Sequence, residues 1–505
     1  MAATFRRAAV ILTLLLGAAS ATQAQPVSLS PDGIGQVLIY PYYTVRNGWT
    51  TLLSIVNNDS ANGKAVKVRF LEGKNGASVA SFNLFLGPDD IWTGAVLPGA
   101  SDEQPARLVS KDNSCTYPLL NPFPPPASSG AGLSFSNQAY VADGDSLALQ
   151  TLDRTREGYI EVIEMASIPL DRSSPSALMK LIYPFFGFSY QQDACGLLSD
   201  AELSKYAAQI SPPTGGLSGA ATLLNAFGGS SAEYTPVALN GFWTTSSSLT
   251  PALTASTAST PNLSSGGNTT AQYFYDGKTY FSKFSRSIDS VSATLMSTEL
   301  LGEHAHTKDG VIGTTWVVSV PTKRFYTQGD ATPPFVRKWD IATGVACDDA
   351  TFTSADRNAY VDRIPPDVGT RPPGPILGLC FATGALNFDP YNVYGTANGI
   401  FYDVFAVNRP GTQNGGSDVI IAGKEGGKTR LKPSSLSATL TSISGSVTTV
   451  DLATGQLNTV FGPHTLYGLP MIGVAFSQSS FKTGNPQQNY ASGFRLQSTR
   501  RITTP

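Results

Sequence analysis

The sequence is short of charge. Only 14% of its 505 residues are Asp, Glu, Lys or Arg, whereas ordinary soluble domains carry about 25%. The 34 basic residues are slightly outnumbered by 36 acidic ones, so the chain lacks the basic excess that neutralises phosphates in nucleic-acid-binding proteins. These shortages exclude nucleic acid as an expected partner.

Histidine and the familiar catalytic motifs are also scarce. The chain has three histidines, and a serine hydrolase would need one of them as its base. The G-x-S-x-G pattern is absent, because Gly216–Ala220 fails at its last position. His464 follows Gly462-Pro463 and is interpreted as a turn residue, with a hydrolase built on it kept as an alternative. The sequence therefore favours a protein that is not an enzyme, and it predicts no cofactor.

Long apolar runs are missing as well. The longest, Ala8–Leu16, follows Arg6 and Arg7 and is too short to span a bilayer. A basic start, a short apolar run and small residues before a cleavage site are typical of a secretory signal peptide. The best cleavage site follows Ala24, with a second choice after Ala21. We expect an exported protein, periplasmic or extracellular, with no transmembrane segment in the mature chain.

The chain has only four cysteines, and an even number favours disulfides in an exported protein. The four cysteines allow three pairings, and neighbours in sequence usually share a domain. We therefore favour Cys115 with Cys195 and Cys347 with Cys380. A metal site is the alternative, and it is disfavoured because no two of these cysteines form a C-x-x-C pair.

What the chain does have is turn residues and strand formers. It contains 49 Gly and 34 Pro, a balance that favours strands joined by turns. Apolar and charged residues alternate over Val66–Phe70, as expected of a half-buried strand. Asn75-Gly76 predicts a two-residue type I′ hairpin turn, with Ser78–Leu86 as the partner strand. The predicted fold is mainly β, with antiparallel β-sandwich domains and a few short helices in connecting segments.

The middle of the chain is predicted to be different. Leu203–Ile210 and Ser218–Phe227 are interpreted as short helices, and Ile288–Leu301 follows a near-helical period ended by Gly302. Thr244–Thr270 is rich in Ser and Thr and carries no charge, so we interpret it as a flexible loop or linker.

These segments suggest a division of the chain. We predict a signal peptide over 1–24, an N-terminal β-sandwich domain over 25–198, a helical and Ser/Thr-rich connecting region over 199–310, and a C-terminal β-rich domain over 311–505.

Several short phrases resemble an exported protein family of proteobacteria with no known activity. They are Tyr40–Val45, Asp112–Cys115, Glu157–Val162, Trp316–Tyr326 and Gly468–Gly473. Because they are scattered over most of the mature chain, the resemblance is to a full-length architecture. It implies export and a common fold, and it brings no ligand or catalytic residue. The Thr244–Thr270 tract looks like a local insertion.

The most metal-like cluster is Glu303–His306. On a strand, His304 and His306 would point to one face and bind one ion, and Asp309 could add a carboxylate. The alternative is a solvated polar stretch just after a helix end. Two histidines without a third ligand rarely hold a metal, so the alternative is favoured.

Two groups of aromatic residues are candidates for binding. Tyr40, Tyr42 and Tyr43 form one, and Tyr273 with Tyr275 forms the other; a further cluster spans 183–190. Exposed rings of this kind stack on sugar faces or form protein interfaces. The competing interpretation, which we favour, is that alternate rings fill sandwich cores.

Paired carboxylates could hydrolyse glycosides. Glu157, Glu161 and Glu164 are close in sequence, but we interpret them as solvated residues on one face of a strand. The sequence therefore predicts an exported cell-envelope or extracellular protein with a binding or structural role, its partner a cell-surface polymer or a protein. The alternatives are a secreted hydrolase and a carbohydrate-binding protein.

Overall fold

The computed structural model describes residues 25–101, 103–120, 132–182, 195, 204–226, 229–244, 260–305, 312–356, 361–362, 376–389, 418–420, 426–433, 438–450, 457–481 and 488–504. The predicted signal peptide, the aromatic cluster 183–190, His306, Asp309 and most of the Ser/Thr-rich tract lie outside these residues. Across the described residues the fold is mainly β and its strand pairs are almost all antiparallel, so the predicted fold class is confirmed.

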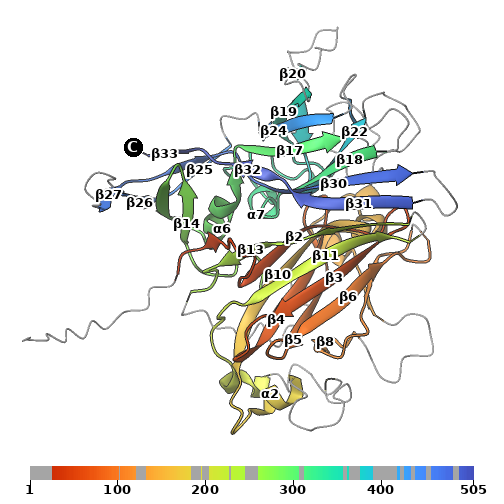
Figure 1. Ribbon diagram of the computed structural model, residues 1–505, viewed down its shortest axis with the longest axis vertical. Helices are drawn as coiled ribbons and strands as arrows, with labels where there is room; N and C mark the ends of the chain where they lie inside the picture. Colours follow the sequence, from red (N-terminus) through yellow and green to blue (C-terminus); the bar gives the residue numbers. More distant parts are fainter. Residues whose placement is uncertain are drawn as a thin grey trace, which may run out of the picture.

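Two antiparallel sheets form a sandwich in the N-terminal half (Figure 1). The seven-stranded sheet runs in the order β1 (Ser28–Leu29), β13 (Val237–Asn240), β2 (Val37–Thr44), β10 (Glu157–Pro169), β4 (Asn62–Glu72), β5 (Ser78–Leu86) and β8 (Cys115–Tyr117). The six-stranded sheet runs in the order β12 (Ser230–Tyr234), β11 (Leu217–Asn225), β3 (Trp49–Asn57), β6 (Ile91–Leu97), β7 (Arg107–Val109) and β9 (Leu133–Ser134).

The sandwich core follows from the two-residue period of its strands. On β3, buried residues alternate with more exposed ones, and Leu53 and Ile55 point inward with Trp92 of β6. Val68 and Phe82 meet them from the seven-stranded sheet. Burying such side chains contributes about 1.5–3 kcal/mol each, so this layer stabilises the sandwich.

The C-terminal half contains two larger sheets. One has the order β23 (Asp418–Ile420), β22 (Thr383–Asp389), β18 (Ile312–Ser319), β30 (Ile472–Phe481) and β31 (Gln488–Arg495). The other has the order β20 (Val361–Asp362), β19 (Asp348–Asp356), β24 (Gly426–Pro433), β17 (Glu299–Ala305) and β32 (Gln497–Thr499), with β21 (Ile376–Leu379) paired to β19.

Three smaller sheets complete the described part of the structure. The four-stranded sheet has the order β14 (Thr270–Tyr275), β15 (Lys278–Lys283), β26 (Ser444–Val450) and β27 (Leu457–Phe461), and Figure 1 shows β26 and β27 projecting from the body. The others are β25 (Thr439–Thr441), β28 (Thr465–Tyr467) and β33 (Ile502–Thr503), and β16 (Met296–Ser297) with β29 (Leu469–Pro470).

Helices are few and short. Those whose bounds lie within the described residues are α1 (Gln138–Ala142), α2 (Ala177–Ile182), α6 (Ser287–Leu295) and α7 (Arg324–Thr327), with 3-10 turns at Leu147–Leu149, Leu152–Arg156 and Ala207–Gln209. The helix predicted over Ile288–Leu301 ends early, at Leu295. Arg500 donates to the carbonyls of Ala293 and Thr294 there, a favourable place for a cation.

The connecting region contributes to the sandwich. The segment Ser218–Phe227 was predicted as a helix, but its residues up to Asn225 belong to β11, which pairs with β3 on one side and β12 on the other. Together with β13, these strands place part of 199–310 inside both sandwich sheets. The N-terminal sandwich therefore extends past residue 198.

The two halves share their core. Val37, Ile39 and Ile163, on the outer face of the seven-stranded sheet, belong to the same hydrophobic cluster as Trp316 and Val318 of β18. Every residue of β2 is buried, because one face meets the six-stranded sheet and the other is covered by the C-terminal half.

The β4–β5 hairpin is present, but its turn is longer than predicted. The loop is residues 73–77, and among its residues only Gly76 has a positive φ, of 69°. The Glu72 carboxylate accepts hydrogen bonds from the N–H groups of Lys74, Asn75 and Ala77. This acid holds the wider loop in place of a type I′ turn.

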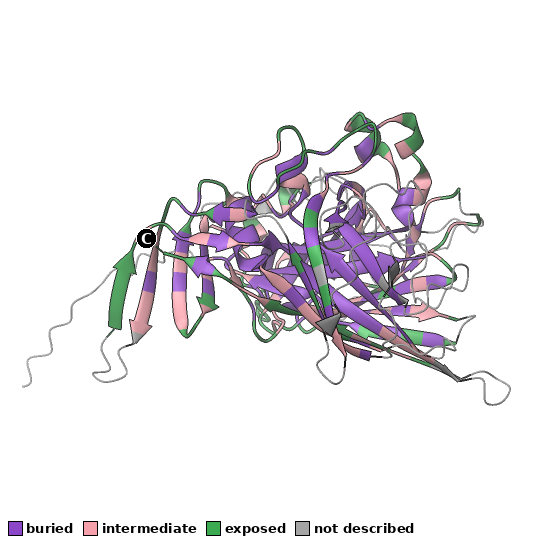
Figure 2. Ribbon diagram, turned by 90° about the horizontal axis from the view of Figure 1, so that it is seen from above, coloured by how far each residue is buried: buried purple, intermediate pink, exposed green. Residues whose placement is uncertain are grey.

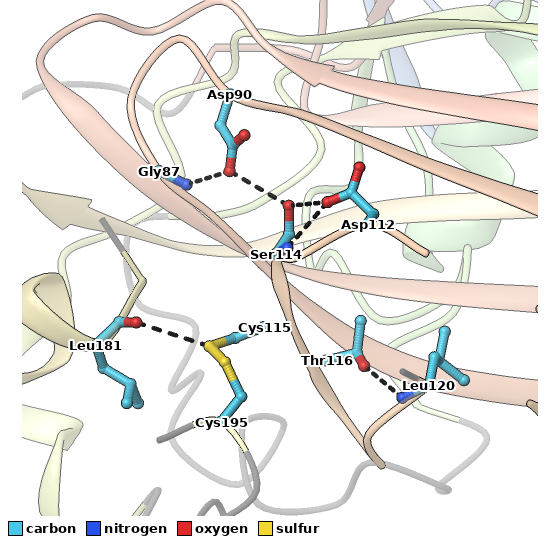
Figure 3. Close-up of a disulfide and its surroundings, with 9 residues drawn as sticks. All are labelled: Gly87, Asp90, Asp112, Ser114, Cys115, Thr116, Leu120, Leu181 and Cys195. Carbon is cyan, nitrogen blue, oxygen red and sulfur yellow. Dashed lines mark hydrogen bonds between the residues drawn. A yellow bond between two sulfur atoms is a disulfide. The ribbon is translucent and has the colours of Figure 1, made fainter. Parts of the chain in front are cut away.

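Both favoured cysteine pairs are at disulfide distance. Cys115 on β8 is joined to Cys195, and Cys347 to Cys380. Figure 3 shows the first disulfide beside Leu181 of α2, whose carbonyl lies 3.7 Å from the Cys115 sulfur. The predicted pairing is confirmed. No helix in the described ranges is long and apolar enough to cross a membrane.

Candidate functional site

The first aromatic group is inside the sandwich. Tyr40, Tyr42 and Tyr43 have no exposed surface. Their hydroxyls donate to the Ser54 carbonyl at 2.7 Å, to Glu157 at 3.1 Å and to the Thr155 carbonyl at 3.1 Å. Burial raises the pKa of all three well above its ordinary value. The rings are therefore core residues, as the favoured interpretation had them, and these three tyrosines form no exposed stacking surface.

In the second aromatic group, the tyrosine side chains are not the exposed ones. Tyr273 is buried and stacks on Tyr280 with ring centres 5.8 Å apart, and Tyr275 is only partly exposed. The residue between them, Phe274, is 70% exposed. Because side chains alternate along a strand, the outward ring of this cluster is the phenylalanine.

His304 points into the protein. It is buried, its ring stacks on Phe388 at 5.0 Å between centroids, and its Nδ1 lies 2.8 Å from the Thr429 hydroxyl. No group of three metal-ligating side chains occurs among the described residues, which do not include His306. The described half of the predicted metal pair is therefore a hydrogen-bonded core histidine.

His464 contacts a serine, as the hydrolase alternative requires. Its Nδ1 is 2.7 Å from the Ser282 hydroxyl, which also contacts the Tyr273 hydroxyl. Burial lowers the pKa of His464, so the imidazole is neutral near pH 7. Yet both Ser282 and His464 are buried, so a substrate has no access to the serine oxygen.

The three glutamates of β10 are buried and paired, not solvated as predicted. Glu157 binds the Arg46 Nε at 2.7 Å, Glu164 lies 3.1 Å from the Lys64 Nζ, and Glu161 pairs with Arg69. Burial raises the pKa of each glutamate, and the adjacent cations oppose that shift. Glu161 lies opposite Ile39 on the outer face, which a distant part of the chain covers. Glu157 and Glu164 lie opposite Thr44 and Val66 on the sandwich side of the sheet.

A second buried network centres on Arg154. Its guanidinium lies 2.9 Å from Glu72 and 2.6 Å from Asp145, above the ring of Tyr140. Trp339 donates to the same Asp145 at 2.7 Å, which ties the C-terminal half to the sandwich. Burial opposes the charge on Glu72, but Arg154 and the loop N–H groups outweigh it and lower the pKa. These charges have structural partners in the fold.

Exposed apolar side chains gather on the four-stranded sheet. Phe461 is 79% exposed, and Leu457 and Val460 of the same strand are also open to solvent. In Figure 2 the strand that is exposed along its whole length lies at the outer end of this sheet. Patches of this kind mark interaction sites on soluble proteins.

One face of this sheet is packed and the other is open. Tyr273, Tyr280 and Val447 belong to a cluster that includes Leu440 and Leu466. The opposite face carries Phe274 in register with Thr279, Thr448 and Thr459, and Phe461 in register with Ser446 and Phe281. The open face is thus a flat array of rings and hydroxyls.

The edge of the sheet is unprotected in the described structure. β27 is the last strand in its sheet order, and Leu457–Phe461 contains no charge and no proline. Natural edge strands are usually shielded by lysine, proline or a bulge, because their free N–H and C=O groups pair readily with another strand. We name this edge and the open face together the β27 surface.

No family model, curated protein or solved structure matches the chain.

Proposed function

We propose that this is an exported, non-enzymatic protein of the cell envelope or the extracellular space, and that it acts by associating with another molecule through the β27 surface. The observation that carries the proposal is an apolar edge strand, exposed along its whole length and free of charge. Two cysteine pairs at disulfide distance support folding outside the reducing cytosol.

Strand addition is the interaction that such an edge favours. An extended segment of a partner protein would extend the four-stranded sheet by main-chain hydrogen bonds, and the exposed side chains would supply specificity. A charge placed on β27 would have to be desolvated in such a complex, so it should weaken association.

A cell-surface polysaccharide is the second candidate partner. Phe274 and Phe461 lie on the open face of the sheet with a row of threonine hydroxyls, and aromatic rings with adjacent hydroxyls suit sugar stacking. This candidate needs the face of the sheet, whereas strand addition needs its edge.

The hydrolase alternative has weaker support. Ser282 and His464 make the required contact, but both are sealed in the core.

The test measures binding of the labelled mature protein to isolated envelopes of the producing cells. We expect Val460→Lys to reduce the bound fraction about tenfold, a loss of about 1.4 kcal/mol. Ile341→Lys is the matched control, because Ile341 is also exposed but lies outside the sheet, and it should bind normally. Equal binding by wild type and Val460→Lys would refute association through the β27 edge. A loss caused only by Phe274→Ser would favour the polysaccharide face.

Export is tested separately by fractionating cells and sequencing the N-terminus. We expect a chain that begins at Gln25 outside the cytosol. Recovery of the uncleaved chain in the cytosol would contradict export. It would leave the proposal of association through the β27 surface unaffected.

A further inference from the structure

The two edges of the four-stranded sheet differ in how open they are. At the β14 edge, the Val27 N–H donates to the Thr270 carbonyl, and the Gln272 N–H donates to the Val27 carbonyl, both at 2.8 Å. The main chain of β14 is therefore partly paired already. At the opposite edge, all five residues of β27 are exposed, and Figure 2 shows this strand at the outer end of the sheet. A further strand is accommodated more readily beside β27.

The direction of the main-chain groups of β27 follows from its pairing with β26. Gly462 directly follows β27, and its N–H donates to the Gly445 carbonyl at 3.0 Å, which continues the β26–β27 register. Hydrogen-bonded and non-hydrogen-bonded pairs alternate along an antiparallel ladder. The N–H and C=O groups of Leu457, Thr459 and Phe461 therefore point away from β26, toward the free edge, and Thr459 is the middle residue of the strand.

This edge is complementary to itself. When a second β27 lies antiparallel to the first, with the two Thr459 residues opposite each other, Leu457 of each copy lies opposite Phe461 of the other. The outward N–H and C=O groups of these three residues are then all paired, because each residue is in the hydrogen-bonding position. An aliphatic residue opposite an aromatic one, and threonine opposite threonine, are favourable cross-strand pairs.

The absence of charge also favours a second copy. A symmetric pair places Thr459 opposite its own copy, so a charge at this position would repel itself, and like charges directly opposite each other destabilise strand pairing. β26 and β27 contain no charged residue. Natural edge strands that avoid pairing with their own copies usually carry lysine or proline, and β27 has neither.

We infer that the β27 edge binds the β27 edge of a second copy of this chain and forms a two-fold symmetric dimer centred on Thr459. The inference rests on the proposed association through the β27 surface, and it names the occupant of that surface. In the dimer, one sheet runs from β14 of the first copy through both β27 strands to β14 of the second. The open faces of the two copies, each with Phe274 and Phe461, lie on the same side of that sheet.

The dimer should be weak, because pairing of a five-residue strand buries little surface. Interfaces below about 1,200 Å² are typical of transient complexes, and we expect a Kd on the order of 100 µM. The purified protein is then a monomer at low micromolar concentrations. Association becomes favourable where many copies are concentrated on the envelope, by mass action.

Sedimentation velocity of the purified mature protein, from about 1 to 300 µM, tests the dimer. We expect the wild type to shift from monomer toward dimer over this range. Thr459→Lys and Thr459→Glu each place like charges opposite each other across the two-fold axis, so each should raise the Kd at least about tenfold. An equimolar mixture of the two variants places opposite charges there, so it should associate at least as tightly as the wild type.

Thr441→Lys is the matched control for the added charge. Thr441 is an exposed threonine on another sheet, so this variant should dimerise like the wild type. Rescue of association in the mixture also shows that both Thr459 variants are folded.

Dimerisation of the wild type and of the mixture, but of neither Thr459 variant alone, would support the β27 pairing. A wild type that stays monomeric at about 300 µM, a mixture that stays monomeric, or equal dimerisation by the wild type and both variants would overturn it. A monomeric wild type whose envelope binding is still lost in Val460→Lys would leave the proposed function intact and would exclude only the second copy as the occupant.

Discussion

The seven-stranded sheet and the four-stranded sheet are both antiparallel, yet the first buries charged residues and the second exposes apolar ones. Both faces of the first sheet are covered, and it buries Lys67, Arg69 and Glu161. The second leaves Phe274 and Phe461 in solvent. The difference lies in what covers each sheet, because alternation along a strand decides only which residues share a face. Charge is buried where a distant segment covers the sheet, and apolar residues are exposed where none of the described segments does.

The largest effect should come from the disulfide that clamps the edge strand β8 of the seven-stranded sheet. Cys115 and Cys195 are 80 residues apart, and Cys347 and Cys380 are 33 apart. On the chain-entropy view, removing the first by paired Ala substitution should lower the free energy of unfolding by about 4–5 kcal/mol, and removing the second by about 3–4 kcal/mol. Urea denaturation measures both; no loss on removing either would contradict the prediction.

Breaking the buried Arg154 network should cost nearly as much. Arg154→Met leaves Glu72 and Asp145 buried without their cation, so the free energy of unfolding should fall by about 3–5 kcal/mol. The matched control is Arg430→Met, whose exposed pair with Glu299 at 3.4 Å should be worth less than about 1 kcal/mol. Similar losses in both variants would mean that burial does not distinguish the two pairs.

Lys67 should make the seven-stranded sheet sensitive to pH. Burial, with help from nearby Arg69, lowers the pKa of Lys67 to about 7, against 10.5 for the ordinary side chain. Between these values the unfolded chain binds more protons than the folded one, so stability must rise with pH. Relative to Lys67→Met, the wild type should gain on the order of 3 kcal/mol from pH 7 to pH 10. Parallel stability curves for the two proteins would refute the shifted pKa.

The smallest effect should be found on the four-stranded sheet. Phe461→Ser removes a ring that is already in water, so the free energy of unfolding should change by less than about 0.5 kcal/mol. Phe82→Ala in the sandwich core should cost about 3–5 kcal/mol. If Phe461→Ser were as costly as Phe82→Ala, the ring would have to be buried, and the β27 surface would not exist as described.

Local features of the fold could be predicted from the sequence. The β4–β5 hairpin joins strands that follow one another in the chain, and each disulfide joins two cysteines that are consecutive in the order of the four. β11 could not be predicted, because the Ala- and Leu-rich segment Ser218–Phe227 has a fair helix propensity. Pairing with β3 and β12 overrides that propensity.

The burial of polar side chains on the seven-stranded sheet was harder to predict. The burial of Tyr159, whose hydroxyl donates to the Pro321 carbonyl at 3.1 Å, depends on a residue far away in sequence, and so does the covered face on which Glu161 lies. By contrast, alternation within Tyr273-Phe274-Tyr275 was visible in the sequence. It implied that Phe274 would be exposed if the tyrosines were buried.

Hydrogen–deuterium exchange, read by mass spectrometry with and without cell envelopes, tests the contrast between the two sheets most directly. The account predicts that Glu157–Pro169 exchanges slowly under both conditions, whereas Leu457–Phe461 exchanges quickly in the free protein and becomes protected when envelopes are added. Rapid exchange over Glu157–Pro169, or no added protection over Leu457–Phe461 in envelope-bound protein, would contradict it.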